Sequence, residues 1–270
     1  MKTEMENINM DESATEIDRT YCRATIYSAL ALGFRPPTDE TVARIIEPQN
    51  AMSLAAAAAL IDFDGKRNLV RGIDALASVG RADASTLGSS YRALFGHIAR
   101  GTVTPYETEY GNEALFQQPQ ELGDLMGFYR AFGLSVRLER RERADHISCE
   151  CEFMSFLAMK EAYTLEQRDA AMLDDTVKAQ KLFLRDHLGR FLATFARQVE
   201  HEHPAGFYAR LADFCLSFVS QEAERFGIRL GPTDLPLRPA GDDQVPMACG
   251  NGAECAAIPG FCPPEDADSV

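Results

Sequence analysis

Residues 145–163 read DHISCECEFMSFLAMKEAY and decide the fold class of this chain, because they form a long apolar segment without proline or glycine. Apolar side chains recur along it at steps of three and four residues: Ile147, Cys151, Met154 and Ala158. Phe153 and Phe156 widen this stripe until it covers most of the circumference. Such a helix is typical of the middle of a bundle. Asp145 is predicted to cap it, because a short carboxylate accepts hydrogen bonds from the free N–H groups of a first helical turn.

Helical patterns cover most of the rest of the chain, and no segment shows a convincing strand pattern. The predicted helices span residues 11–32, 38–47, 52–63, 68–79, 85–101, 119–132, 165–200 and 206–226. The stretch GTVTPYETEYG, residues 101–111, reads as an extended segment or a turn. We therefore predict an all-α protein with a single helical bundle domain. Its parts are a flexible N-terminus at 1–14, the bundle at 15–230 and an irregular tail at 231–270.

The charge balance excludes some classes of partner. Lys and Arg number 27 against 41 Asp and Glu, which gives a net charge of −14 without a compensating basic block. Nucleic acid binding needs clustered cations, so we expect no nucleic-acid partner and favour one that brings positive charge. The chain has no apolar run of about 18 residues, and its polar, acidic start lacks the order of a secretory signal. We expect a cytoplasmic protein without stable membrane insertion.

The tail at 231–270 differs in composition from the rest of the chain. It holds seven of the thirteen prolines and seven acidic residues against one arginine, a composition that does not build a core. Cys249, Cys255 and Cys262 lie there among glycines that let a loop turn back on itself, so their thiolates are candidate ligands for zinc or an iron–sulfur cluster. Their spacing matches no common CxxC pattern and no fourth ligand is evident. A flexible, thiol-bearing tail without metal is the alternative.

No catalytic motif accompanies the two Asp-His pairs, Asp145-His146 and Asp186-His187. Neighbouring residues of a helix point in different directions, so neither pair makes a catalytic dyad by itself. The sequence shows no nucleophile motif, no Gly-rich phosphate loop and no HExxH zinc site. We expect a protein that is not an enzyme. Asp145-His146 keeps two interpretations: a polar contact at the mouth of a binding groove, or a helix cap beside a buried histidine.

Three ordered segments resemble the TorD/DmsD/NarJ family of redox-enzyme (molybdoenzyme) maturation chaperones. The residues that carry the resemblance are, in chain order, Leu94-Phe95, Pro105-Tyr106-Glu107, Tyr110, Asp145-His146, Glu150, Glu152, Phe153, and the run from Phe183 through His187 and Phe195 to Leu211. They are similar to the family's LF…PYE pattern, its helix that begins with Asp-His, and its C-terminal helical pattern. The resemblance covers about residues 15–228.

The resemblance implies a chaperone that binds the precursor of a molybdopterin-containing oxidoreductase subunit, through its twin-arginine signal peptide, its body or both. Such a chaperone supports cofactor insertion and proofreading before export or membrane attachment. The resemblance implies no required cofactor, and a monomer or a homodimer. A signal peptide combines a basic end with an apolar stretch, so its site needs an acidic rim beside an apolar groove.

The resemblance also indicates which side chains bind the client. They are Leu94, Phe95, Tyr106, Glu107, Tyr110, Asp145 and His146. One position departs from the family pattern: Arg143 stands where many relatives have proline, two residues before the Asp. The alternative function is a metal- or iron–sulfur-binding accessory protein that uses the C-terminal cysteines.

Overall fold

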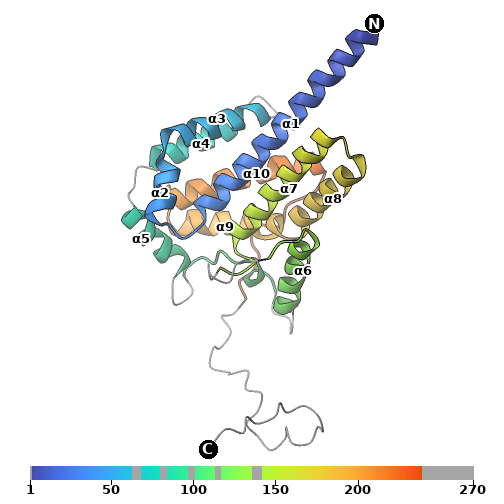
Figure 1. Cartoon of the computed structure of the whole chain (residues 1–270). Helices are drawn as coiled ribbons and strands as arrows, with labels where there is room; N and C mark the ends of the chain where they lie inside the picture. The colour runs from blue at the N-terminus through green and yellow to red at the C-terminus, as the bar shows by residue number, and fades with distance from the viewer. Residues whose placement is uncertain are drawn as a thin grey trace, which may run out of the picture. The chain divides into compact units, whose positions relative to one another are not determined.

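The computed structural model describes residues 2–62, 68–79, 84–96, 101–112, 117–135 and 142–238. Within these ranges the chain forms ten α-helices and one short 3₁₀ helix and has no strand, which confirms the predicted all-α class (Figure 1). The elements are α1 (Lys2–Gly33), α2 (Asp39–Ile46), α3 (Pro48–Ile61), α4 (Asn68–Val79), α5 (Ala84–Phe95), η1 (Glu107–Glu109), α6 (Gln117–Ala131), α7 (Ile147–Gln167), α8 (Ala170–Asp186), α9 (Leu188–Glu202) and α10 (Phe207–Phe226). No helix in the described part of the chain is long and apolar enough to cross a bilayer.

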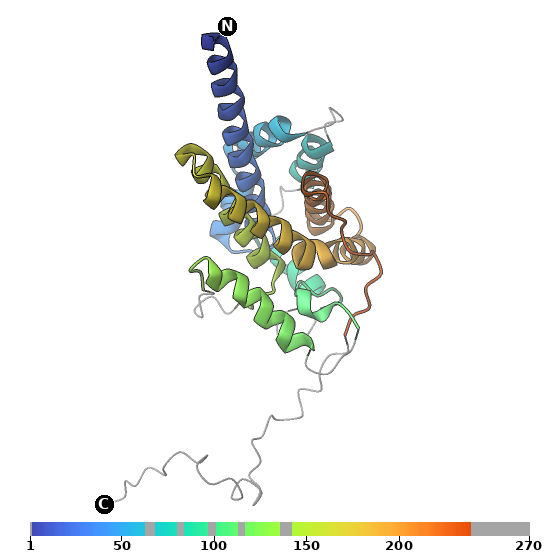
Figure 2. The ribbon, with the colours of Figure 1, turned by 90° about the vertical axis from the view of Figure 1, so that its right-hand side faces the viewer.

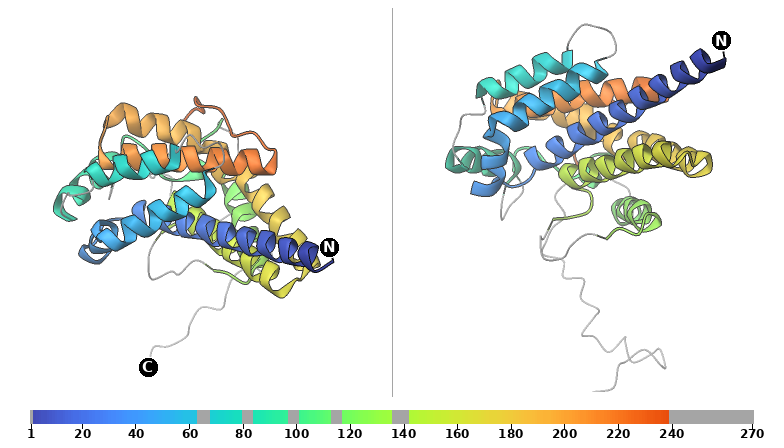
Figure 3. Two further views of the ribbon diagram at one scale, coloured as in Figure 1. Left: turned by 90° about the horizontal axis from the view of Figure 1, so that it is seen from above. Right: turned by 45° about the horizontal axis from the view of Figure 1, so that its top comes forward.

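Helix α7 lies inside the bundle, side by side with α1 and packed on its other side against α8 (Figures 1 and 3). The predicted apolar stripe is confirmed, because its four members are all 0% exposed: Ile147, Cys151, Met154 and Ala158. Helix α10 packs against α9 and α4, and α3 bridges α1 and α4. The core therefore continues from α7 through α1 to α3, and from α3 through α4 to α10. Helix α7 starts beside the segment at 101–112.

The stretch at 165–200, predicted as one helical segment, is divided among three helices. Helix α7 ends before Arg168, which is left-handed with φ 55°. The carboxylate of Asp169 then accepts from the N–H of Met172 at 3.0 Å and caps α8. A second break at His187, with φ −121° and ψ −99°, separates α8 from α9. This break turns the imidazole of His187 away from the helix, towards a carboxylate from another part of the chain.

Two further helix ends differ from the predicted ones. Helix α5 ends at Phe95 rather than at Gly101, because the next residue, Gly96, adopts a positive φ of 81° that side-chain-bearing residues avoid. Helix α1 begins at Lys2 rather than near Asp11, because neither proline nor glycine interrupts this part of the sequence. The predicted division of the chain at residue 14 therefore coincides with no break in secondary structure.

The compact unit extends through Arg238, beyond the boundary predicted at residue 230. Residues 228–238, here called the C-terminal strap, leave α10 and run along α9 (Figure 2). The hydroxyl of Thr194 on α9 donates to the carbonyl of Pro232 at 2.8 Å and accepts from the N–H of Leu235 at 3.0 Å. The remainder of the predicted tail, with Cys249, Cys255 and Cys262, lies outside the described residues.

Candidate functional site

Residues 101–112, here called the motif loop, carry the PYE segment and are held between the start of α7 and the C-terminal strap. On one side the N–H of Glu107 donates to the carbonyl of Asp145 and the N–H of Ile147 donates to the carbonyl of Pro105, both at 2.9 Å. On the other side the N–H of Gly111 donates to the carbonyl of Pro236 at 2.8 Å, and Arg238 N–H donates to Glu109 O at 2.9 Å. Three segments that are distant in sequence thus satisfy one another's backbone groups.

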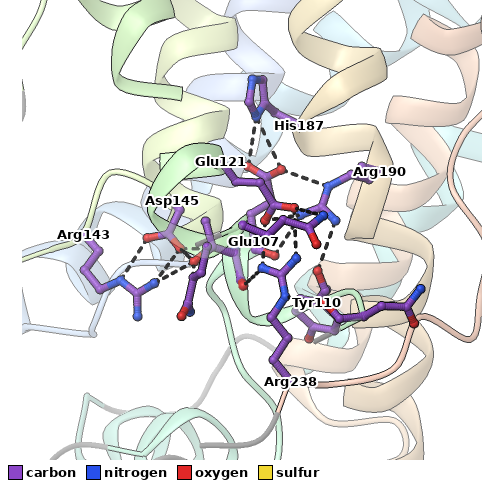
Figure 4. A network of polar contacts seen from close by, with 12 residues as sticks. Glu107, Tyr110, Glu121, Arg143, Asp145, His187, Arg190 and Arg238 are labelled. Atoms are coloured by element: carbon purple, nitrogen blue, oxygen red, sulfur yellow. Dashed lines mark hydrogen bonds and ion pairs between the residues drawn. The ribbon is translucent and has the colours of Figure 1, made fainter. Parts of the chain in front are cut away.

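The carboxylate of Glu107 lies at the centre of a buried charge cluster (Figure 4). It is 1% exposed, and it contacts Nδ1 of His187 at 3.1 Å and Nε of Arg190 at 3.0 Å. Arg190 also donates to the carbonyls of Glu107 and Tyr110, each at 3.1 Å. A carboxylate taken out of water is tolerated only when it is paired and hydrogen-bonded, and the break at His187 supplies one of these partners. The cluster ties the motif loop to the α8–α9 junction.

Arg238 joins the strap, the motif loop and α6 (Figure 4). Its Nη1 and Nη2 form a two-pronged pair with the carboxylate of Glu121 at 2.8 and 2.9 Å, and its Nε donates to the carbonyl of Asn112 at 3.1 Å. Paired donors of this kind fix geometry as well as charge. Gly111 makes room for it: with φ at 131°, an added Cβ would lie 2.9 Å from Nη2 of Arg238.

Asp145 does not cap α7, contrary to the prediction. Its carboxylate instead accepts from the hydroxyl of Thr108 at 2.7 Å, from the Thr108 N–H at 3.3 Å, and from Arg143 through Nε at 3.0 Å and Nη2 at 2.7 Å. The residue that caps the helix is His146, whose Nδ1 accepts from the N–H of Ser148 at 3.1 Å. The physical reason is competition: the motif loop and Arg143 use the Asp145 carboxylate fully, so the cap falls to the next side chain.

His146 is fully buried and neutral. Burial, followed by the nearby positive charges of Arg143 and Arg35, lowers the pKa of His146 to about 3. Because Nδ1 accepts from Ser148, the proton resides on Nε2, which points to the hydroxyl of Tyr91 at 3.3 Å. The ring of Tyr106 packs edge-on against the imidazole with centroids 5.3 Å apart. His146 therefore links the start of α7 to α5 and to the motif loop.

The structure brings five of the seven predicted client-binding residues into one cluster: Tyr106, Glu107, Tyr110, Asp145 and His146. Leu94 and Phe95 lie in the core beside it. The carbonyl of Leu94 accepts from Val103 N–H at 2.9 Å, and the Phe95 ring meets the rings of Tyr91, Phe195 and Tyr208. Only Tyr106 among the seven is more than slightly exposed. Their role in binding a client stays a prediction.

Sequence reasoning missed several side chains of the cluster: Thr108, Glu121, Arg190 and Arg238. Arg143 was noted only as a departure from the family pattern. One available signal was His187 inside an otherwise apolar, periodic segment, because a buried imidazole needs a hydrogen-bond partner. Beside the Glu107 cluster lies an open hollow of about 650 Å³ between α6 and the α8–α9 junction. Gly123 and Gly127, which have no neighbour within 4 Å of an added Cβ, form part of its wall. Within the described residues, no group of three or more His, Cys, Asp or Glu side chains is placed to hold a metal ion.

The fold and site define a class of protein. It is an all-α bundle in which the PYE segment of the motif loop contacts the Asp-His pair at the start of α7. The profile of the family described as nitrate reductase delta subunit matches residues 57–197. The chaperone protein TorD of Shewanella loihica is 30% identical over 230 residues, which cover 78% of this chain and 97% of the relative. TorD of Vibrio cholerae is 27% identical over 205 residues (74% and 90%), and the perchlorate reductase assembly chaperone protein of Dechloromonas aromatica is 26% identical over 236 residues (82% and 96%). The chain belongs to the TorD/DmsD/NarJ family of redox-enzyme maturation chaperones.

Proposed function

We propose that this chain is a chaperone that binds the precursor of a molybdopterin-containing oxidoreductase subunit and supports cofactor insertion and proofreading before export or membrane attachment. Family membership supports this proposal. The observation that carries it is the convergence of the two family motifs: Thr108 and Asp145, 37 residues apart, share a hydrogen bond inside one cluster. Motif residues that are distant in sequence but meet at one place are expected when they serve one binding site. Motif residues that served only core packing would be expected to lie at separate places in the bundle.

The charge and the shape of this region support a client with a basic end and an apolar stretch. The chain has a net charge of −14, and Asp124 and Asp186 add carboxylates to a hollow that Phe128 and Ala131 line with apolar surface. Such a surface attracts a basic segment and accommodates an apolar one. The seven predicted residues remain the proposed client site: Tyr106 reaches its surface, and the six buried members hold the motif loop in shape.

The proposed role requires neither catalysis nor a resident cofactor. In the described site, Glu107, Asp145 and His146 are engaged with partners of the same chain, which suits a binding surface better than a reacting centre. We place the chain in the cytoplasm, as a monomer or a homodimer, with the precursor of the catalytic subunit as its partner. No nucleic acid partner belongs to this proposal.

Co-purification with the cognate precursor, full-length and without its signal peptide, tests the proposal. We expect the tagged chain to retain the full-length precursor. Tyr106→Ala should weaken retention, because it removes the surface residue of the site, and Tyr163→Ala should not, because that tyrosine is exposed elsewhere on α7. Retention of neither precursor form by the wild-type chain would overturn the proposed function.

A further inference from the structure

The guanidinium of Arg143 occupies a site that matches it group by group (Figure 4). Each of its three nitrogens has a partner: Nε with Asp145 Oδ1 at 3.0 Å, Nη2 with Asp145 Oδ2 at 2.7 Å and the Thr108 hydroxyl at 2.9 Å, and Nη1 with Glu109 Oε1 at 3.2 Å. The guanidinium carbon also lies 4.4 Å from the centroid of the Tyr106 ring. Two acidic groups in a fixed fork and an aromatic face recognise the planar shape of a guanidinium, which an ammonium group does not reproduce.

The walls of this site are built into the fold, whereas its occupant comes from the surface. Asp145 is 0% exposed and is held by Thr108, and its carbonyl accepts from Glu107 N–H. The side chain of Arg143 is 40% exposed. The carboxylate of Asp145, the main acceptor, is therefore held by Thr108 independently of Arg143, and the arginine enters from the solvent side. The site can be described as a receptor for a guanidinium that the chain fills with its own side chain.

We propose that the site made by Asp145, Thr108, Glu109 and Tyr106 recognises an arginine side chain of the client precursor, and that Arg143 occupies it until the client's arginine takes its place. This inference rests on the proposed function for the identity of the ligand. The buried carboxylate of Asp145 is paired with a guanidinium both before and after the exchange, so the bound state carries no cost of an unpaired buried charge. A lysine cannot pair with both carboxylate oxygens through a planar fork, so the site selects arginine over lysine.

The exchange also sets the affinity. While Arg143 fills the site, only the fraction of molecules with a vacated site can bind, so the apparent affinity for a client arginine is reduced by that fraction. Truncation of Arg143 removes the competitor. If Arg143 vacates the site less than a tenth of the time, Arg143→Ala should bind an arginine-bearing ligand about tenfold or more tightly than the wild type. The position thus tunes client affinity without contributing a favourable contact to the client.

The first test needs no client and uses chemical rescue of Arg143→Ala. We expect millimolar methylguanidinium chloride to raise its melting temperature above the value in equal methylammonium chloride, because only the former replaces the lost fork. The wild type and Arg185→Ala, which truncates an exposed arginine paired with Asp186, should respond equally to both salts. An equal response of Arg143→Ala to both salts would overturn the inference.

The second test uses the wild-type chain, so it stands even where Arg143→Ala does not fold. Nitrogen-15 spectra of arginine side chains, with the Arg143 Nε–H signal assigned through Arg143→Lys, are recorded while a synthetic peptide of the precursor's N-terminal segment is added. We expect the Arg143 signal to move to the position of a solvent-exposed arginine with the native peptide, and not with a peptide whose arginines are lysines. Peptide binding that leaves this signal unchanged would refute the exchange while the proposed function stands. Chemical rescue without precursor binding would keep the guanidinium site and refute the proposed function.

Discussion

The carboxylate of Asp145 and the guanidinium of Arg143 form a two-pronged ion pair in which the acid is 0% exposed and the arginine is 40% exposed. The pair explains why Asp145 is not the helix cap, because its lone pairs are already used by Arg143 and by the motif loop. It also gives the two residues of the Asp-His motif different tasks: Asp145 holds the motif loop, and His146 starts α7.

Replacement of Asp145 should destabilise the bundle through the motif loop. Asp145→Asn turns amide hydrogens towards donors that now lack an acceptor, and we expect a loss of about 2–3 kcal/mol in the free energy of unfolding. This loss is smaller than is usual for a broken buried ion pair, because the Arg143 side chain is 40% exposed and can be solvated by water. Urea denaturation measures it. Asp186→Asn, at an exposed pair, should cost less than about 1 kcal/mol, and an equal loss at both positions would contradict the assignment.

Stability should depend on pH through His146. The pKa of this side chain is about 3 in the folded chain against 6.5 for an ordinary histidine, so between these values the unfolded chain binds the extra proton. The contribution of the neutral His146 to the free energy of unfolding is complete above pH 6.5 and is lost as the pH falls towards 3. The loss amounts to roughly 2 kcal/mol between pH 6.5 and pH 5.

The matched variant for this effect is His146→Asn, which retains a capping side chain but does not titrate. We expect the stability difference between wild type and variant to shrink as the pH falls below 6.5. Burial raises the pKa of Glu222 to about 7, which acts in the opposite direction, but this group is present in both proteins and cancels in the difference. A difference that stays constant from pH 7 to pH 5 would show that His146 is not held neutral.

Loss of the Glu107 charge should release the α8–α9 junction. Glu107→Gln removes the buried negative charge and turns an amide NH2 towards one of its two partners, His187 or Arg190, so we expect a loss of about 3 kcal/mol in the free energy of unfolding. Glu200→Gln, at an exposed position of α9, should change it by less than about 0.5 kcal/mol. Equal urea midpoints for the two variants would contradict the central place of Glu107.

Two glycines should respond to alanine with opposite signs. An added Cβ at Gly189 would lie 2.3 Å from the carbonyl oxygen of Leu184, so Gly189→Ala has to shift backbone at the helix junction and should cost about 3 kcal/mol. At Gly127, on α6, nothing lies within 4 Å, so Gly127→Ala should gain about 0.5–1 kcal/mol from helix propensity. Thermal unfolding of both variants checks this, and destabilisation by Gly127→Ala would contradict the open wall of the hollow.

Helix periodicity and capping residues predicted those helices whose bounds depend on interactions between residues close in sequence. The range 68–79 matches α4, and Thr38 caps α2 by accepting from the N–H of Thr41 at 3.2 Å, as its type and position indicate. The break at His187 was not predictable in this way, because its partner Glu107 is 80 residues away. Arg238 likewise meets Glu121 across 117 residues. Long-range pairs decide these features, and periodicity in one sequence carries no information about them.

The same distinction applies to the candidate site. Motif resemblance identified Tyr106, Glu107, Asp145 and His146, which the structure gathers into one cluster. It did not indicate that three of these four side chains are buried, or that Arg143 fills the space beside Tyr106. Burial follows from how the motif loop docks onto α7, and the loop is also held by the strap, whose Arg238 contacts Asn112 across 126 residues of sequence.

Hydrogen exchange of the purified chain, with and without its precursor, tests the central claim most directly. We expect precursor binding to slow exchange in the motif loop, residues 101–112, and at the start of α7, residues 142–148, while α3 and α4 on the other side of α1 are unchanged. We expect the Arg143→Lys variant to bind the precursor as well, with slowed exchange in the same two segments. A precursor that binds without altering exchange in these two segments, or that does not bind at all, would contradict the claim that the joined motifs form the client site.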